Sequence, residues 1–177
     1  MRNNPVTESY DSLFDMGEKD ILVLLALANY DRLSNENKNS DIIYHVSMAL
    51  EKFLKGYLIK NNIEVQKIHE IEILYKQVFN NNNKFNLIEN ECKYIDRFGA
   101  MVKYNNSVKI AEETVVNAVK YLEKIYNFEL IKTIREELRE KHDDFSTKED
   151  IIFDISNYDM SPVMAVKNAV NHSKGNK

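Results

Sequence analysis

Glycine, proline and cysteine are all scarce in this sequence of 177 residues, which has four glycines, two prolines, one cysteine and no tryptophan. All-β folds need many glycine and proline turns, so their scarcity argues against a β-sandwich or a barrel. The single cysteine, Cys92, excludes an internal disulfide and a cysteine-rich zinc site. A lone cysteine also agrees with a reducing compartment. We therefore expect a cytoplasmic protein built from helices.

Long apolar runs and excess positive charge are missing as well. The most apolar run, residues 21–28 (ILVLLALA), is about half as long as a membrane-spanning helix. The first twenty residues lack the apolar core of a secretory signal. The formal net charge is −4, whereas proteins that hold nucleic acid over their whole surface are usually basic. We expect a soluble protein with no membrane partner, in which any contact with RNA comes from a local basic patch.

Apolar residues recur at helical spacing along most of the chain. The clearest helix is expected over residues 41–60, where Ser40 or Asp41 supplies the N-cap. Its apolar face consists of Ile42, Ile43, Val46, Leu50, Phe53, Leu54, Tyr57 and Leu58. A polar loop (SNENKNS) is expected before it, over residues 34–40. Further helices are expected over residues 21–33, 68–79, 87–104 and 108–141, the last being one helix or two joined near Asn127.

No strand pattern of any length appears, so the predicted fold class is all-α, with four or five helices in an antiparallel up-down bundle. The bundle is assigned to residues 1–141, and we expect one of its helices to be interrupted or closely packed at Gly99. Residues 142–177 are expected to form a helical C-terminal extension. Its start signals are a capping box that begins at Ser146 and a first-turn proline, Pro162.

Residues 41–74 carry a pattern that is similar to a known family. The sequence YHVSMALEKFLKGYLIKNN, followed by KIHEIEILY, contains a histidine, a small residue, Glu-Lys-x-Leu-Lys and a second histidine that opens the next helix. In this order the residues are His45, Ala49, Glu51, Lys52, Leu54, Lys55 and His69. The pattern resembles the HEPN domain family (higher eukaryote and prokaryote nucleotide-binding helical bundle) over roughly residues 15–130. The resemblance implies a helical bundle that binds a nucleotide or an RNA.

The same residues also have an explanation that needs no ligand. Glu51 and Lys55 are four residues apart, in the order that stabilises any helix by a few tenths of a kcal/mol. His45 and Lys52 are seven residues apart and share one side of a helix. Both His45 and His69 fit equally well as surface or capping histidines. The residues by themselves leave the two interpretations open.

The resemblance also implies where a ribonuclease motif would lie. Many HEPN proteins are metal-independent ribonucleases in which an arginine and a histidine, separated by four to six residues, act on the scissile phosphate at a dimer interface. Arginine offers a fixed fork of donors to phosphate, and histidine can move a proton near neutral pH. In this chain Arg97 is followed, after six residues, by Tyr104 instead of a histidine. A phenol is a poor base at neutral pH, so we predict that this motif is degenerate.

A second arginine–histidine pair lies later in the chain. Arg135 is followed, after six residues, by His142, and this spacing places both on one face of a helix. The pair falls beyond the segment that resembles the family, and a solvated helix end explains it as well. Catalysis by Arg135 and His142 therefore stays open as an alternative.

We predict a HEPN-like bundle with a degenerate ribonuclease motif that acts as a binding or partner subunit. The residues expected to contact a nucleotide or an RNA are His45, Lys52, Lys55, His69, Arg97, Lys103 and Tyr104. No metal or other cofactor is expected, because no histidines fall in H-x-x-x-H spacing and no glycine-rich phosphate loop is present.

The family resemblance implies the partners. We expect a homodimer, and a nucleotidyltransferase-like protein partner in a defence or toxin–antitoxin setting. Two other functions remain open. One is an active metal-independent ribonuclease toxin, and the other is a structural protein-interaction module.

Overall fold

The computed structural model describes residues 7–28, 35–65, 68–105 and 108–141. These residues form six α-helices and one short 3₁₀ helix, with no strand among them. The prediction of an all-α fold is confirmed. In chain order the elements are α1 (Tyr10–Ala28), α2 (Asn35–Lys60), α3 (Ile71–Asn81), η1 (Asn83–Ile88), α4 (Glu89–Tyr104), α5 (Glu112–Tyr126) and α6 (Glu129–Lys141).

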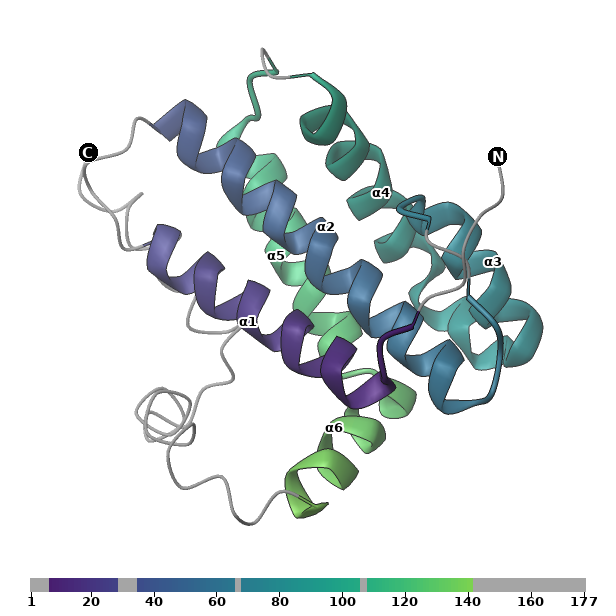
Figure 1. Cartoon of the computed structure of the whole chain (residues 1–177). Helices are drawn as coiled ribbons and strands as arrows, with labels where there is room; N and C mark the ends of the chain where they lie inside the picture. The colour runs from purple at the N-terminus through teal and green to yellow at the C-terminus, as the bar shows by residue number, and fades with distance from the viewer. Residues whose placement is uncertain (1–6, 29–34, 66–67, 106–107, 142–177) are drawn as a thin grey trace.

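Helix α2 is the centre of the molecule (Figure 1). It packs against α1 on one side and against α3 and α4 on the other, while α5 lies behind it. One side of α2 is covered by none of the other described helices and lies between α1 and α4. Two groups of ionisable side chains border this side of α2.

The apolar face predicted for residues 41–60 enters the core as expected. All eight of its members are buried, with exposures between 0% and 5%. Burying a side chain of this size stabilises a fold by about 1.5–3 kcal/mol, so this face anchors α2 among its neighbours. A small residue lets α2 approach α1 closely. An added Cβ atom at Gly56 of α2 would lie 2.6 Å from the ring of Phe14 on α1.

Two predicted boundaries at the start of the chain were wrong. Helix α1 begins at Tyr10, not near residue 21, because Leu13, Phe14 and Gly17 continue the buried side of α1 towards the N-terminus. Helix α2 begins at Asn35, within the predicted loop 34–40. Side chains of this segment bond outside it: Asn39 donates to the carbonyl of Ile110 at 2.9 Å, and Ser40 to that of Val108 at 3.2 Å.

The later helices follow the predicted pattern with small shifts. Helix α3 begins at Ile71, and η1 occupies the segment before α4. The segment 108–141 was predicted to form one helix or two joined near Asn127, and it forms two. The N–H of Asn127 donates to the carbonyl of Glu123 at 3.0 Å, at the end of the first of these helices. The start signals at Ser146 and Pro162 lie outside the described residues.

Gly99 marks a close contact within an uninterrupted α4. An added Cβ atom there would lie 2.4 Å from the hydroxyl oxygen of Ser47 on α2 and 2.6 Å from its Cβ atom. Glycine therefore brings α4 close to α2, and the alternative of close packing at Gly99 is confirmed. None of the described helices has both the length and the apolar character that a membrane span requires.

Candidate functional site

Glu51 is the centre of a largely buried group of ionisable side chains. Its carboxylate accepts hydrogen bonds from Lys55 Nζ at 2.8 Å, His69 Nδ1 at 2.9 Å and Lys103 Nζ at 3.3 Å. Helix α2 supplies Glu51 and Lys55, the segment before α3 supplies His69, and α4 supplies Lys103. We call these four residues the Glu51 cluster.

The Glu51 cluster is buried at its base and open at its top. The side chains of Glu51, Lys55 and Lys103 are 4%, 7% and 11% exposed, whereas that of His69 is 63% exposed. An ionised carboxylate can only accept a hydrogen bond, so the Nδ1 atom of His69 donates to Glu51. The other ring nitrogen, Nε2, therefore points away from Glu51 on an exposed side chain.

The surrounding charges keep Glu51 ionised. Burial by itself raises the pKa of Glu51, but the hydrogen bond and charge of Lys55, with the charges of Lys103 and His69, outweigh burial and bring the pKa below its ordinary value of 4.5. Asp96 on α4 is a nearby acid whose pKa is raised by burial, although the N–H of Ile71 donates to it at 3.2 Å. Among the described carboxylates, Glu51 is the one that pairs directly with the two ammonium groups of the cluster.

A second, smaller group of a carboxylate, a lysine and a histidine joins α1 to α2. Asp20 accepts a hydrogen bond from His45 Nδ1 at 2.8 Å and forms an ion pair with Lys52. The side chain of Asp20 is 10% exposed, that of Lys52 is 13% and that of His45 is 24%. We call these three residues the Asp20 cluster. As in the first cluster, a carboxylate orients an imidazole through Nδ1 and pairs with a lysine.

The two clusters border one side of α2. At about 100° of rotation per residue, the positions of Glu51, Lys55, Lys52 and His45 fall within about 120° of the helix circumference. His45 and Lys52 bond to Asp20 of α1 and Glu51 bonds to Lys103 of α4, so this side of α2 faces the space between α1 and α4. The structure thus brings together five predicted site residues, namely His45, Lys52, Lys55, His69 and Lys103.

Two predicted residues of α4 lie apart from the clusters. Arg97 is six residues from Lys103, which places it about 120° around the helix. Its guanidinium is exposed and lies 5.5 Å from the centre of the Phe98 ring. Tyr104 is 76% exposed at the C-terminal end of α4.

Arg135 is held inside the protein. Its side chain is 7% exposed, its Nε atom donates to Glu18 at 3.2 Å, and one terminal nitrogen donates to the carbonyl of Tyr126 at 2.9 Å. The guanidinium also lies 3.1 Å from the centre of the Tyr126 ring. Burial lowers the pKa of Arg135, and it raises the pKa of Tyr126 to about 12. These contacts occupy Arg135 with protein groups, and His142 lies outside the described residues.

Sequence reasoning missed both carboxylates as organising groups. Asp20 could have been found, because it directly precedes the most apolar run of the chain, and a charged residue among buried positions usually has a buried partner. Glu51 was noted as part of the family pattern and as a helix neighbour of Lys55, but not as a site residue. Its bonds to His69 and Lys103 join three segments, and no spacing along the chain predicts them.

The described residues contain no group of three metal-ligating side chains placed to hold an ion. Both clusters instead combine lysine and histidine with a carboxylate, which suits the recognition of anions more than that of cations.

Comparison with known proteins adds the family. The sequence model of the HEPN domain matches residues 25–141, about two thirds of the 177 residues. The chain belongs to the HEPN family. The HEPN match includes the whole Glu51 cluster and ends before the C-terminal 36 residues, and Asp20 on α1 precedes it. Neither the curated proteins nor the solved structures provide a match to the chain.

Proposed function

We propose that this HEPN protein binds a phosphate-bearing ligand, a nucleotide or an RNA, on the side of α2 between α1 and α4. One observation carries the proposal: Lys55 and Lys103 converge on the single carboxylate of Glu51, below the exposed ring of His69. We further propose that the protein acts as a binding or partner subunit in the cytoplasm.

The electrostatics of the Glu51 cluster suit an anion. Two ammonium groups share one carboxylate, so each retains hydrogen atoms that Glu51 does not accept. A unit charge 4 Å from one of them gains about 4 kcal/mol at the effective dielectric of a protein surface, before the cost of desolvating the ligand. Asp96 offsets part of this attraction, because it lies close enough for Lys103 to affect its pKa.

The histidine of this cluster can add a further donor. Since Nδ1 of His69 donates to Glu51, Nε2 can donate to a phosphate only when the ring is protonated. When the ring is neutral, the two lysines are the donors of the cluster that remain for the phosphate.

The binding experiment uses fluorescence polarisation with labelled ATP and a labelled ten-nucleotide RNA. Lys103→Met should weaken both ligands by about tenfold, the effect of losing about 1.4 kcal/mol. The matched control is Lys132→Met on α6, where Lys132 is exposed and, among the residues that the structure describes, forms an ion pair only with its helix neighbour Glu136. Equal affinities of Lys103→Met and the unmodified protein would overturn the proposal, provided that both show the same far-UV circular dichroism.

A second function is favoured by the orientation of His69. Its Nδ1–H bond to buried Glu51 leaves Nε2 exposed, as a general base requires. Nε2 would accept the proton of a ribose 2′-hydroxyl while that oxygen attacks phosphorus. The bond from phosphorus to the 5′ oxygen would break, and the ammonium of Lys103 would protonate the departing oxygen. Cleavage of RNA in EDTA that is lost in His69→Gln supports this function, and an absence of cleavage in the unmodified protein refutes it.

The biological setting is proposed from the family alone. We propose a homodimer that works with a nucleotidyltransferase-like protein in a defence or toxin–antitoxin system. Light scattering after size exclusion tests the dimer. Co-purification with a nucleotidyltransferase-like protein from a neighbouring gene tests the partnership, and a failure to co-purify argues against it.

A further inference from the structure

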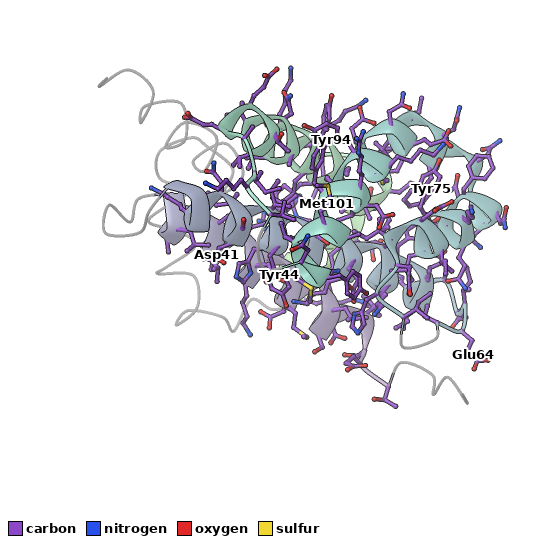
Figure 2. All side chains as sticks on the ribbon, turned by 90° about the horizontal axis from the view of Figure 1, so that it is seen from above. Asp41, Tyr44, Glu64, Tyr75, Tyr94 and Met101 are labelled. Carbon is purple, nitrogen blue, oxygen red and sulfur yellow. The ribbon has the colours of Figure 1, made fainter. Side chains whose placement is uncertain are left out.

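Three aromatic rings form a continuous cluster between α4 and α5, away from the Glu51 cluster. The centres of the Phe98 and Tyr94 rings are 4.9 Å apart with planes at 52°, and those of Tyr94 and Tyr121 are 4.9 Å apart with planes at 84°. All three side chains are partly exposed. Figure 2 shows Tyr94 in the view from above, with Met101, two helical turns later, further along α4.

Polar and flexible groups border these rings. The guanidinium of Arg97 lies 5.5 Å from the centre of the Phe98 ring, and Met101 is 41% exposed. The hydroxyl groups of Tyr94 and Tyr121 form no hydrogen bond with any residue that the structure describes. The rings therefore combine apolar faces with free polar tips, as binding surfaces do.

The charge around the rings is positive. Lys93 pairs with Glu89 at 2.6 Å, and Lys124 pairs with Glu91 at 2.6 Å. Arg97, and Lys120 next to Tyr121, form no ion pair with the described part of the chain. In a protein with a net charge of −4, this makes a local cationic surface that complements a polyanion.

We propose that Tyr94, Phe98, Tyr121 and Arg97 form a platform on which unpaired bases of single-stranded RNA stack. The inference rests on the proposed function, since it names RNA as the ligand whose phosphates reach the Glu51 cluster. Aromatic rings and guanidinium planes stack on unpaired bases without regard to sequence. Bases in a duplex are already paired and stacked, so the platform selects single strands.

The two surfaces lie on opposite sides of α4. Tyr94 and Lys103 are nine residues apart, which places them about 14 Å apart along the axis of α4 and about 180° apart around it. A flexible strand that crosses α4 can place a phosphate at Lys103 and bases several nucleotides away on the rings. A duplex is too stiff to follow this path, and a mononucleotide is too short.

The experiment compares three probes on one protein: labelled ATP, a labelled ten-nucleotide single-stranded RNA, and the same RNA in a duplex. The variants are Tyr94→Leu, which keeps an apolar side chain but removes the ring, and Arg97→Gln. Phe79→Leu is the control, because Phe79 is an aromatic residue of α3 with 39% exposure. Each platform variant should weaken single-stranded RNA about tenfold and leave ATP unchanged, while Phe79→Leu changes neither.

Each outcome decides for or against the platform. Unchanged RNA affinity in Tyr94→Leu and Arg97→Gln overturns the platform, and so does equal affinity for single-stranded and duplex RNA. The phosphate site still stands in that case if Lys103→Met weakens the binding of ATP. No RNA binding by the unmodified protein overturns the platform as well. A loss of dimer mass in Tyr94→Leu with unchanged RNA affinity identifies the surface as a protein interface instead.

Discussion

Replacing Glu51 by glutamine tests the physical basis of the candidate site. The substitution keeps the size and shape of the side chain but removes the charge that holds Lys55, Lys103 and His69 together. Lys55 is only 7% exposed, so its ammonium would face an amide in a largely dry environment. Removing one partner of a buried ion pair costs about 3–5 kcal/mol. Because the amide oxygen can still accept one hydrogen bond, we expect the lower end, about 3 kcal/mol.

Such a loss is large against a total stability of about 5–15 kcal/mol for a domain of this kind. With a urea dependence of about 1–3 kcal/mol per molar, the unfolding midpoint of Glu51→Gln should fall by about 1–3 M. The double variant Glu51→Gln/Lys55→Met should lose less than the two single variants together, because Lys55 no longer has a charged partner to lose. Additive losses, or an unchanged midpoint in Glu51→Gln, would refute the reasoning.

The pH dependence gives an independent check of the same prediction. The pKa of Glu51 in the folded protein lies below its ordinary value of 4.5. A carboxyl group with a lowered pKa stabilises the fold above its unfolded pKa, and this contribution is lost as the pH falls through the folded pKa. The stability difference between the unmodified protein and Glu51→Gln should therefore be full at pH 7 and shrink below about pH 4.5. A difference that stays constant into acid would contradict an ionised Glu51.

Three further predictions concern the fold. Gly99→Ala should destabilise the protein by about 1–3 kcal/mol. Adding Ser47→Ala to this variant should not relieve the clash, because the Cβ atom of Ser47 itself lies 2.6 Å from the added methyl group. Chemical denaturation of the single and the double variant checks both statements. Arg135→Met should lower the melting temperature, because Glu18 loses its buried partner; an unchanged melting temperature would leave Arg135 free for another role. The thiol of Cys92 should react with Ellman's reagent only after denaturant is added, because burial raises its pKa and shields it; rapid reaction of the folded protein would be inconsistent with this.

The helices themselves were readable from local patterns. The apolar positions of residues 41–60 repeat at the helical period, and all eight are buried, because a helix can bury only one face in this way. The start of α1 was not readable, since charged residues such as Asp11, Asp15 and Glu18 obscure the buried Phe14 and Gly17. Their burial depends on α2, which lies against α1 in space.

The candidate site was predictable in its cations but not in its arrangement. His45, Lys52 and Lys55 share one side of a single helix, and helical spacing alone places them there. Lys103 and Arg97 were expected to act together, but they lie on different sides of α4, and Lys103 turns towards Glu51. A prediction from spacing along one helix cannot choose which side of that helix meets its neighbour.

By itself the sequence determined the helical class, the buried face of α2 and the presence of lysines and histidines along one side of it, because these depend on neighbours three or four residues apart. Only the tertiary structure decided that Asp20 joins α1 to His45, and that Glu51 joins α2 to His69 and Lys103. The physical reason is that a buried carboxylate needs several partners, and most partners of Glu51 and Asp20 come from other segments. Those partners are chosen by how the helices pack.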